Sequence, residues 1–147
     1  MLYRILSRAL LPVMVSLPLA AAAAQPVVEV YKTASCGCCK AWIRHLEENG
    51  FSVKSHDVPD PGDYRAKFGI AQQHASCHSA QVGGYAVEGH VPASDIKRML
   101  ATRPRAAGLA VPGMPMGSPG MEGAHADPYE VLLVKKDGST SVYKRYR

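Results

Sequence analysis

Residues 27–49 read VVEVYKTASCGCCKAWIRHLEEN, and this stretch decides the fold. The apolar run at its start predicts a short strand. Beyond residue 39, apolar side chains recur at helical spacing up to Gly50, a residue type that suits a helix C-cap. The Cys-Gly-Cys-Cys sequence at residues 36–39 lies at the turn between the two elements. Because a helix N-terminus favours thiolate over thiol, this turn is a reactive position for cysteine.

A second strand is expected after this helix. Phe51–Val58 alternates apolar and polar side chains, which predicts a strand parallel to the first. The three elements would form a βαβ unit with a right-handed crossover. Asp63–Phe68 is predicted as a short helix closed by Gly69.

The second half of the chain predicts further elements of both kinds. Gln81–Val87 is predicted as a strand or hairpin arm, and Pro92–Thr102 as a helix. Gly108–Asp127 is rich in Gly, Pro and Met and has no periodicity, so we predict a loop. A loop of that length inside a domain is usually functional or disordered.

The chain ends with a strong hairpin pattern. Two strand-like runs, Tyr129–Lys136 and Thr140–Tyr146, flank an Asp-Gly pair at residues 137–138. Together with the βαβ unit and the further helices, this C-terminal β-hairpin predicts an α/β fold.

The first residues have the order of a secretory signal peptide. Two arginines precede an apolar stretch, Ala9–Ala20, and small residues follow up to Ala24. We expect residues 1–24 to be cleaved and residues 25–147 to form one periplasmic domain. The alternative is an uncleaved anchor, but the apolar stretch is shorter than the roughly 20 residues of a membrane span. No later segment is apolar enough to be expected to cross a bilayer.

The charge pattern argues against one class of partner. The chain has 17 basic and 12 acidic residues and a net charge of +5. The basic residues are scattered, except for three near the C-terminus. They form no helical stripe with interleaved aromatic side chains, the pattern that nucleic-acid binding requires. We therefore expect a solvated basic C-terminus and no nucleic-acid partner.

The cysteine content is unusual for an exported domain. In an oxidising compartment four cysteines ordinarily form two structural disulfides. Three of the four lie within residues 36–39 here, and a bridge between the adjacent Cys38 and Cys39 would be strained. At least two of the clustered thiols therefore cannot form structural disulfides, and we expect them to bind metal or to undergo redox cycling.

Two chemistries use such a cluster. Cys36 and Cys39 have the spacing of a redox pair at a strand-to-helix turn. With Cys38 they offer three soft sulfur ligands, more than dithiol exchange needs. Thiolates select soft ions such as Cu(I), with Zn(II) as the commonest competitor. We also place Cys77, the remaining thiol, in this site because polar residues flank it.

Four segments resemble a known family. They are Thr33–Cys39, Cys77-His78, Val87–Pro92 (VEGHVP) and Gly108–Pro115 (GLAVPGMP). Together they resemble the exported CopG-type copper-resistance proteins, over nearly all of the chain after the signal peptide. The Cys-Gly-Cys-Cys-Lys sequence also resembles the Cys-Gly-Pro-Cys-Lys turn of thioredoxin-like proteins, with Cys38 in place of proline. The resemblance implies a thioredoxin-like fold that holds copper through the three-cysteine turn and Cys77, as a small cluster of several Cu(I) ions.

Further ligands are expected around the cysteines. His78 adjoins Cys77 and is a candidate ligand. The thioredoxin-like resemblance places a proline-containing loop against the cysteine turn, so Met114 in Pro-Gly-Met-Pro is expected to bring a thioether to the metal. The alternative is that Met114 only packs the loop. The weaker accessory candidates in this loop are Met116, Met121 and His125. The remaining histidines, expected to be structural, exposed or hydrogen-bonded to a turn, are His45, His56, His74 and His90.

Two functions compete. The first is an exported copper-binding protein of copper resistance or homeostasis, which holds Cu(I) and exchanges it with other periplasmic copper-handling proteins. Whether it also changes the oxidation state of copper, as an oxidoreductase would, is left open. The second is a thiol-disulfide oxidoreductase in which Cys36 is the nucleophile and Cys39 the resolving thiol. A zinc site is a third candidate, but zinc has little use for thioethers.

Overall fold

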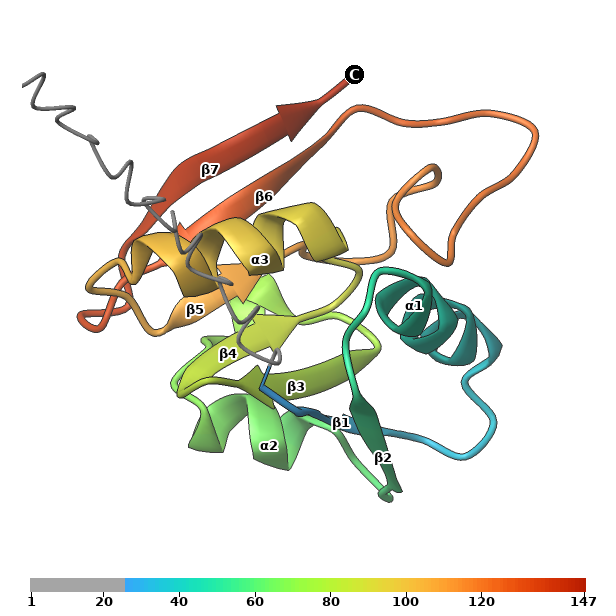
Figure 1. Cartoon of the computed structure of the whole chain (residues 1–147), viewed down its shortest axis with the longest axis horizontal. Helices are drawn as coiled ribbons and strands as arrows, with labels where there is room; N and C mark the ends of the chain where they lie inside the picture. The colour runs from blue at the N-terminus through green and yellow to red at the C-terminus, as the bar shows by residue number, and fades with distance from the viewer. Residues whose placement is uncertain (1–25) are drawn as a thin grey trace, which may run out of the picture.

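A seven-stranded mixed sheet forms the centre of the computed structural model, which describes residues 26–147 (Figure 1). The strands lie side by side in the order β2-β1-β3-β4-β5-β6-β7. The predicted signal peptide, residues 1–24, lies outside the described residues. The α/β class predicted from the sequence is confirmed.

The cysteine turn joins the first strand to the first helix. β1 (Val28–Lys32) leads into α1 (Gly37–Glu48), and β2 (Val53–Asp57) pairs in parallel with β1, as predicted. The helix begins two residues earlier than expected. The reason is that Cys36 is its N-cap, with a sulfur atom that accepts a hydrogen bond from the Cys39 N–H.

Gln81–Val87, predicted as a strand or hairpin arm, spans the turn of a hairpin. This hairpin follows α2 (Gly62–Lys67) and a short 3-10 helix, η1 (Gln72–His74). Its strands are β3 (His78–Val82) and β4 (Tyr85–Glu88). The turn between them, Gly83-Gly84, has two positive φ angles, which glycine adopts without strain.

The predicted loop Gly108–Asp127 begins with a strand. After α3 (Ala93–Thr102), β5 (Gly108–Ala110) pairs in parallel with β4 and antiparallel with β6 (Tyr129–Val134). The loop prediction is wrong over these three residues, because a three-residue strand is too short to show a periodicity. The C-terminal hairpin is confirmed, with β6 paired antiparallel to β7 (Thr140–Tyr146).

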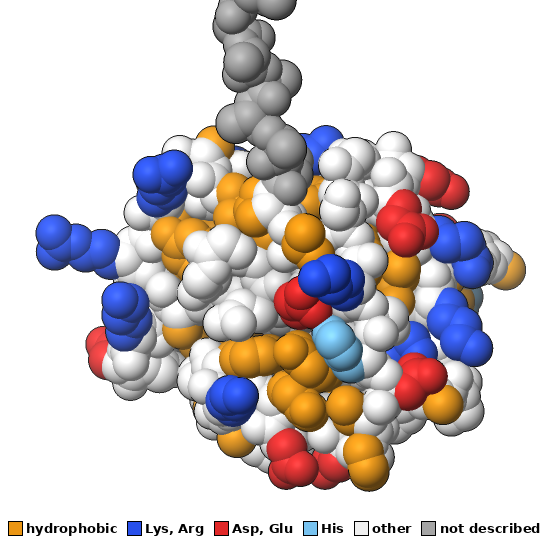
Figure 2. All heavy atoms as spheres, turned by 60° about the horizontal axis from the view of Figure 1, so that its bottom comes forward, with side chains coloured by type: hydrophobic (Ala, Val, Ile, Leu, Met, Phe, Trp, Pro, Cys, Tyr) orange, Lys and Arg blue, Asp and Glu red, His pale blue; other side chains and the backbone are white. Residues whose placement is uncertain are grey.

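Helices cover both faces of the sheet. α1 and α3 pack on one face through Trp42, Leu46, Ile96 and Met99, all fully buried. α2 lies on the other face (Figure 1). There Tyr64 stacks on Tyr31 of β1. Basic and acidic side chains are interspersed on the face drawn in Figure 2. Within residues 26–147, each helix is too short or too polar to cross a membrane.

Candidate metal centre

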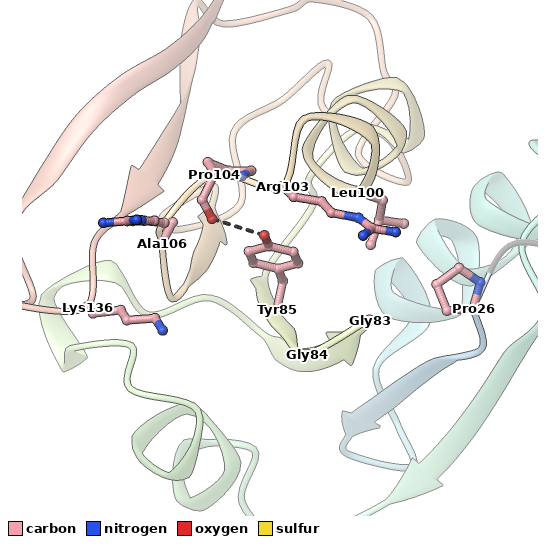
Figure 3. Close-up of a pocket in the computed structure, with 10 residues that line it drawn as sticks. Pro26, Gly83, Gly84, Tyr85, Leu100, Arg103, Pro104, Ala106 and Lys136 are labelled. Atoms are coloured by element: carbon pink, nitrogen blue, oxygen red, sulfur yellow. Dashed lines mark hydrogen bonds between the residues drawn. The ribbon is translucent and has the colours of Figure 1, made fainter.

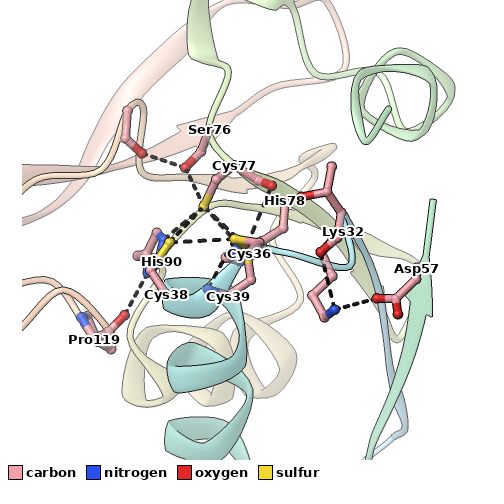
Figure 4. The surroundings of a disulfide bond; sticks show 12 residues. Lys32, Cys36, Cys38, Cys39, Asp57, Ser76, Cys77, His78, His90 and Pro119 are labelled. Carbon is pink, nitrogen blue, oxygen red and sulfur yellow. Dashed lines mark hydrogen bonds and ion pairs between the residues drawn. A yellow bond between two sulfur atoms is a disulfide. The ribbon is translucent and has the colours of Figure 1, made fainter. Parts of the chain in front are cut away.

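Four sulfur atoms converge at the N-terminal end of α1 (Figure 4). Cys36 is the N-cap of α1, Cys38 and Cys39 lie in its first turn, and Cys77 lies directly before β3. The sulfurs of Cys36, Cys38, Cys39 and Cys77, called here the four-sulfur cluster, all lie within 4.8 Å of one another. The Cys77 sulfur is 3.5 Å from that of Cys39 and 3.8 Å from that of Cys38. The sheet thus brings together residues that are 38 positions apart in the sequence.

The cluster is in its oxidised form. Cys36 and Cys39 form a disulfide, with 5.4 Å between their Cα atoms. All four cysteines belong to the described part of the chain, and Cys38 and Cys77 are the free thiols. Cys39 is fully buried, whereas the free thiols are half-buried. The arrangement therefore supports reversible redox chemistry as well as metal binding.

A buried ion pair holds the segment before Cys77. Glu88 is fully buried, and its Oε1 accepts hydrogen bonds from Arg65 Nε and from the Ser76 N–H, both at 2.8 Å. Its Oε2 accepts from the Ser79 hydroxyl at 2.5 Å. Removing one partner of such a pair typically costs about 3–5 kcal/mol, because the other charge stays buried. Residues on both sides of Cys77 are thereby fixed.

Two buried histidines face the Cys77 sulfur. His90 Nε2 lies 3.0 Å from it, and His78 Nδ1 lies 3.4 Å from it. Both side chains are fully buried, and the His78 ring packs on the indole of Trp42 at a centroid distance of 4.3 Å. Cys77, His78 and His90 form a second group whose ligand atoms lie within 4.8 Å of one another.

The burial of these groups shifts their protonation. Burial, followed by the neighbouring Cys38, raises the pKa of the Cys77 thiol to about 12. Burial, followed by His90, lowers the pKa of His78 to about 3. The pKa of His90 is also lowered, chiefly by burial. Both imidazoles are therefore neutral at pH 7, which is the form that binds metals.

The middle of the long loop covers the site. Pro119 accepts a hydrogen bond from His90 Nδ1 at 2.8 Å. Gly120 packs so closely on α1 that a Cβ there would lie 2.7 Å from the Trp42 backbone N and 2.8 Å from the Cys38 carbonyl O. Residues 117–122 are called the covering loop below.

The methionine candidates lie in the same long loop. Met114 is 50 % exposed, so it is not a core side chain. Its loop is fastened beside Cys77, because the Ser76 hydroxyl donates to the Gly113 carbonyl at 2.5 Å. Met116 and Met121 are half-buried, while His125 is exposed. The ligand roles of the three methionines stay predictions.

His90 is the site residue that the sequence analysis missed. We expected it to hydrogen-bond a turn, which it does through Nδ1, but its other nitrogen faces Cys77. The Gly83-Gly84 pair in the sequence could have indicated where His90 lies. A hairpin centred on these residues pairs Val82 with Tyr85, and the same register continued outward sets residue 90 opposite residue 77. The other three histidines expected to be structural or exposed lie outside both groups.

A surface hollow of ≈ 560 Å³ lies away from these groups (Figure 3). It is bordered by the β3–β4 turn, the end of α3 and Lys136, and Tyr85 donates a hydrogen bond to the Pro104 carbonyl in it. Its lining holds no cysteine or histidine. The four-sulfur cluster is therefore the better candidate site.

Comparison with known proteins finds a family model and two solved structures that are similar to this chain. A family model described as "Protein of unknown function, DUF411" matches residues 74–121, which include Cys77, His78 and His90. Two solved structures, named "Copper resistance protein copG- Form 1" and "Form 2", are each 44 % identical to this chain. The match to Form 1 spans 83 % of this chain and 98 % of that structure's chain, with a TM-score of 0.78. The match to Form 2 spans 84 % of this chain and 99 % of that structure's chain, with a TM-score of 0.79. A search of curated proteins found no match.

Proposed function

This chain belongs to the family of the copper resistance protein CopG, and we propose that it is an exported protein that binds Cu(I) through the four-sulfur cluster. The observation that carries the proposal is the convergence of four cysteine sulfurs within 4.8 Å of one another. Soft thiolates select Cu(I), with Zn(II) as the main competitor, and the relationship to copper resistance proteins favours copper. Export is inferred from the signal-peptide pattern of residues 1–24.

Reduction must precede the binding of Cu(I) by all four sulfurs. The Cys36–Cys39 disulfide occupies two of them, and a disulfide sulfur carries no thiolate charge. In the reduced protein the N-terminus of α1 stabilises negative charge on Cys36, which already accepts a backbone hydrogen bond. A thiolate can bridge two ions, so the reduced cluster can hold more than one Cu(I). The ions would be exchanged with other periplasmic copper-handling proteins.

The proposal extends to the fold. We assign β1–β4 with α1 and α3 as a thioredoxin-like core, to which β5–β7 add three strands at the β4 edge. The parallel β1–β2 pair and the antiparallel β1–β3 and β3–β4 pairs support this assignment. In this arrangement Cys77, directly before β3, faces the cysteine turn.

A thiol-disulfide oxidoreductase is the second candidate. The observation in its favour is the Cys36–Cys39 disulfide itself, at a helix N-terminus and with a half-buried nucleophile candidate in Cys36. This function gives no role to Cys38 or Cys77, although both sulfurs lie in the cluster.

Anaerobic purification with elemental analysis and thiol titration separates the two functions. Copper together with four protected thiols supports the metal site. A metal-free protein with two titratable thiols, which reduces or oxidises model dithiols rapidly, supports the oxidoreductase and rejects Cu(I) binding.

Replacing Cys38 with serine tests the cluster directly. We expect Cys38→Ser to lower the Cu(I) capacity of the reduced protein by about one ion per chain, because a bridging thiolate is lost. The measurement is anaerobic titration with a Cu(I) complex of a competing chelator. Ser35→Ala, at an exposed position in the same turn, is the control. An unchanged capacity in Cys38→Ser would remove the argument for metal over simple redox chemistry.

A further inference from the structure

Oxidation of the cluster removes sulfur donors but leaves nitrogen donors in place. With Cys36 and Cys39 joined, the free thiols of Cys38 and Cys77 remain, and both imidazoles of His78 and His90 face Cys77. The donor set thus changes from four sulfurs to two sulfurs and two nitrogens. Mixed sets of this kind suit borderline divalent ions, as in Cys₂His₂ zinc sites.

The separations of the other three donors from the Cys77 sulfur suit a single ion. In tetrahedral coordination with metal–sulfur bonds of about 2.3 Å and metal–nitrogen bonds of about 2.0–2.1 Å, neighbouring donors lie about 3.3–3.8 Å apart. The observed separations from the Cys77 sulfur are 3.8 Å to Cys38, 3.4 Å to His78 and 3.0 Å to His90. Small rotations of the side chains would bring these separations to the ideal values.

His90 is oriented in the way that metal-ligating histidines usually are. The Pro119 carbonyl can only accept, so His90 Nδ1 carries the hydrogen, and Nε2 presents its lone pair to Cys77. A ligating histidine almost always donates its other ring N–H to a carbonyl or carboxylate in this manner. The covering loop therefore fixes the tautomer that coordination requires.

His78 offers its Nδ1 to the same sulfur. This atom lies 3.4 Å from the Cys77 sulfur, in a ring that is fully buried. The ring packs on Trp42, which keeps Nδ1 beside Cys77. Ligation through Nδ1 would leave the ring hydrogen on Nε2, the one buried side-chain nitrogen or oxygen atom without a hydrogen-bond partner in residues 26–147.

We propose that the disulfide form of the protein binds one divalent ion, of the Zn(II) or Co(II) type, through Cys77, His78 and His90, with Cys38 as the fourth ligand. This inference rests on the proposed function only in that both place a metal in this part of the chain. The ion would replace the thiol protons, which pass to solvent, and no electron would be transferred. The site would then hold Cu(I) when reduced and a single harder ion when oxidised.

The test uses the wild-type chain in its disulfide form, with Zn(II) and Co(II) as probes. We expect about one ion per chain and, for Zn(II), an X-ray absorption spectrum with two nitrogen and two sulfur neighbours at about 2.0–2.1 and 2.3 Å. Co(II) should show a thiolate charge-transfer band. These measurements need no variant, so they stand even if a substitution impairs folding.

Variants then assign the ligands. His90→Ala should weaken Zn(II) binding by the disulfide form more than about 100-fold, beyond the effect of losing an outer-sphere partner. His56→Ala, at an exposed histidine outside both groups, should leave the affinity unchanged. Failure of the disulfide form to bind either ion, a spectrum without sulfur, or unchanged affinity in His90→Ala would each overturn the inference.

A parallel Cu(I) titration of the reduced protein keeps the two proposals apart. Cu(I) binding by the reduced form without divalent-ion binding by the oxidised form rejects the inference alone. Absence of Cu(I) binding by the reduced form rejects the proposed function, whatever the disulfide form binds.

Discussion

Cys77 is the residue that joins all parts of the candidate centre. Its sulfur contacts Cys38, Cys39 and both buried histidines. Because burial raises the pKa of its thiol to about 12, the metal-free protein carries a proton there at neutral pH. Metal binding must release that proton, so the affinity should rise with pH.

The buried histidines make the metal-free protein sensitive to acid. The pKa of His78 is about 3 in the folded chain, against about 6.5 for an ordinary histidine. Between these values the unfolded chain binds more protons, so the free energy of unfolding falls as the pH falls. We expect a loss of about 2 kcal/mol from pH 7.5 to pH 5, and His90 adds to it in the same direction.

Thermal unfolding of the metal-free protein at several pH values checks this expectation. Above about pH 7.5 the unfolded ring is neutral as well, so the histidine contribution to the slope should vanish there. The carboxylates with lowered pKa values titrate below this window and contribute little to it. A midpoint that rises on acidification to pH 5 would contradict the assignment.

Met114 tests the thioether prediction. Because its side chain is 50 % exposed, Met114→Ala should cost less than about 1 kcal/mol of stability. If the thioether caps the cluster, copper should pass faster to a competing chelator and air oxidation should accelerate, with the thiolate count unchanged. Val142→Ala, at an exposed apolar residue of β7, is the control. Copper release at the wild-type rate in Met114→Ala would reject the ligand role.

At the scale of elements, the covering loop is held by a close backbone approach. Gly120 has φ +84 and no room for a Cβ against α1. Gly50 has nearly the same angle, φ +86, with nothing within 4 Å of the Cβ position. Replacing either glycine by another residue would impose a similar backbone strain. Only at Gly120 would the new Cβ also clash with neighbouring atoms.

Substitution of these glycines by alanine tests the covering role. Gly50→Ala should cost about 1–2 kcal/mol through backbone strain alone. Gly120→Ala should cost more and should also speed copper release, because the loop must move off α1 and give up the His90–Pro119 hydrogen bond. Unfolding and chelator-driven release are the measurements. Equal release rates in the two variants would show that the loop does not cover the site.

For the whole molecule, the proposed function couples redox state to metal content. The thiolates proposed to hold Cu(I) are also the groups that oxidise, so forming the Cys36–Cys39 disulfide should expel Cu(I). Bound Cu(I) should in turn slow alkylation of the thiols by at least about tenfold. Mass spectrometry after timed alkylation measures this effect. Equal rates for copper-loaded and metal-free reduced protein would mean that the clustered thiols are not the ligands.

Much of the architecture could be predicted from local patterns. The strand before the cysteine turn, α1, β2 and the C-terminal hairpin follow from periodicity and from an Asp-Gly turn, which act over a few residues. β5 was missed because its three residues acquire strand structure only by pairing with β4 and β6. The β3–β4 turn was missed although its Gly-Gly pair was visible.

The sequence by itself determined that three thiols share one turn, because neighbours in the chain stay neighbours in any fold. It also determined that a helix follows that turn, because helical periodicity is a local property. Only the tertiary structure decided that Cys77 and His90 meet those thiols. Their positions depend on the β1–β3 pairing and the β3–β4 register, which join distant segments. The covering loop likewise reaches His90 through contacts that no periodicity records, since irregular backbone is positioned by packing alone.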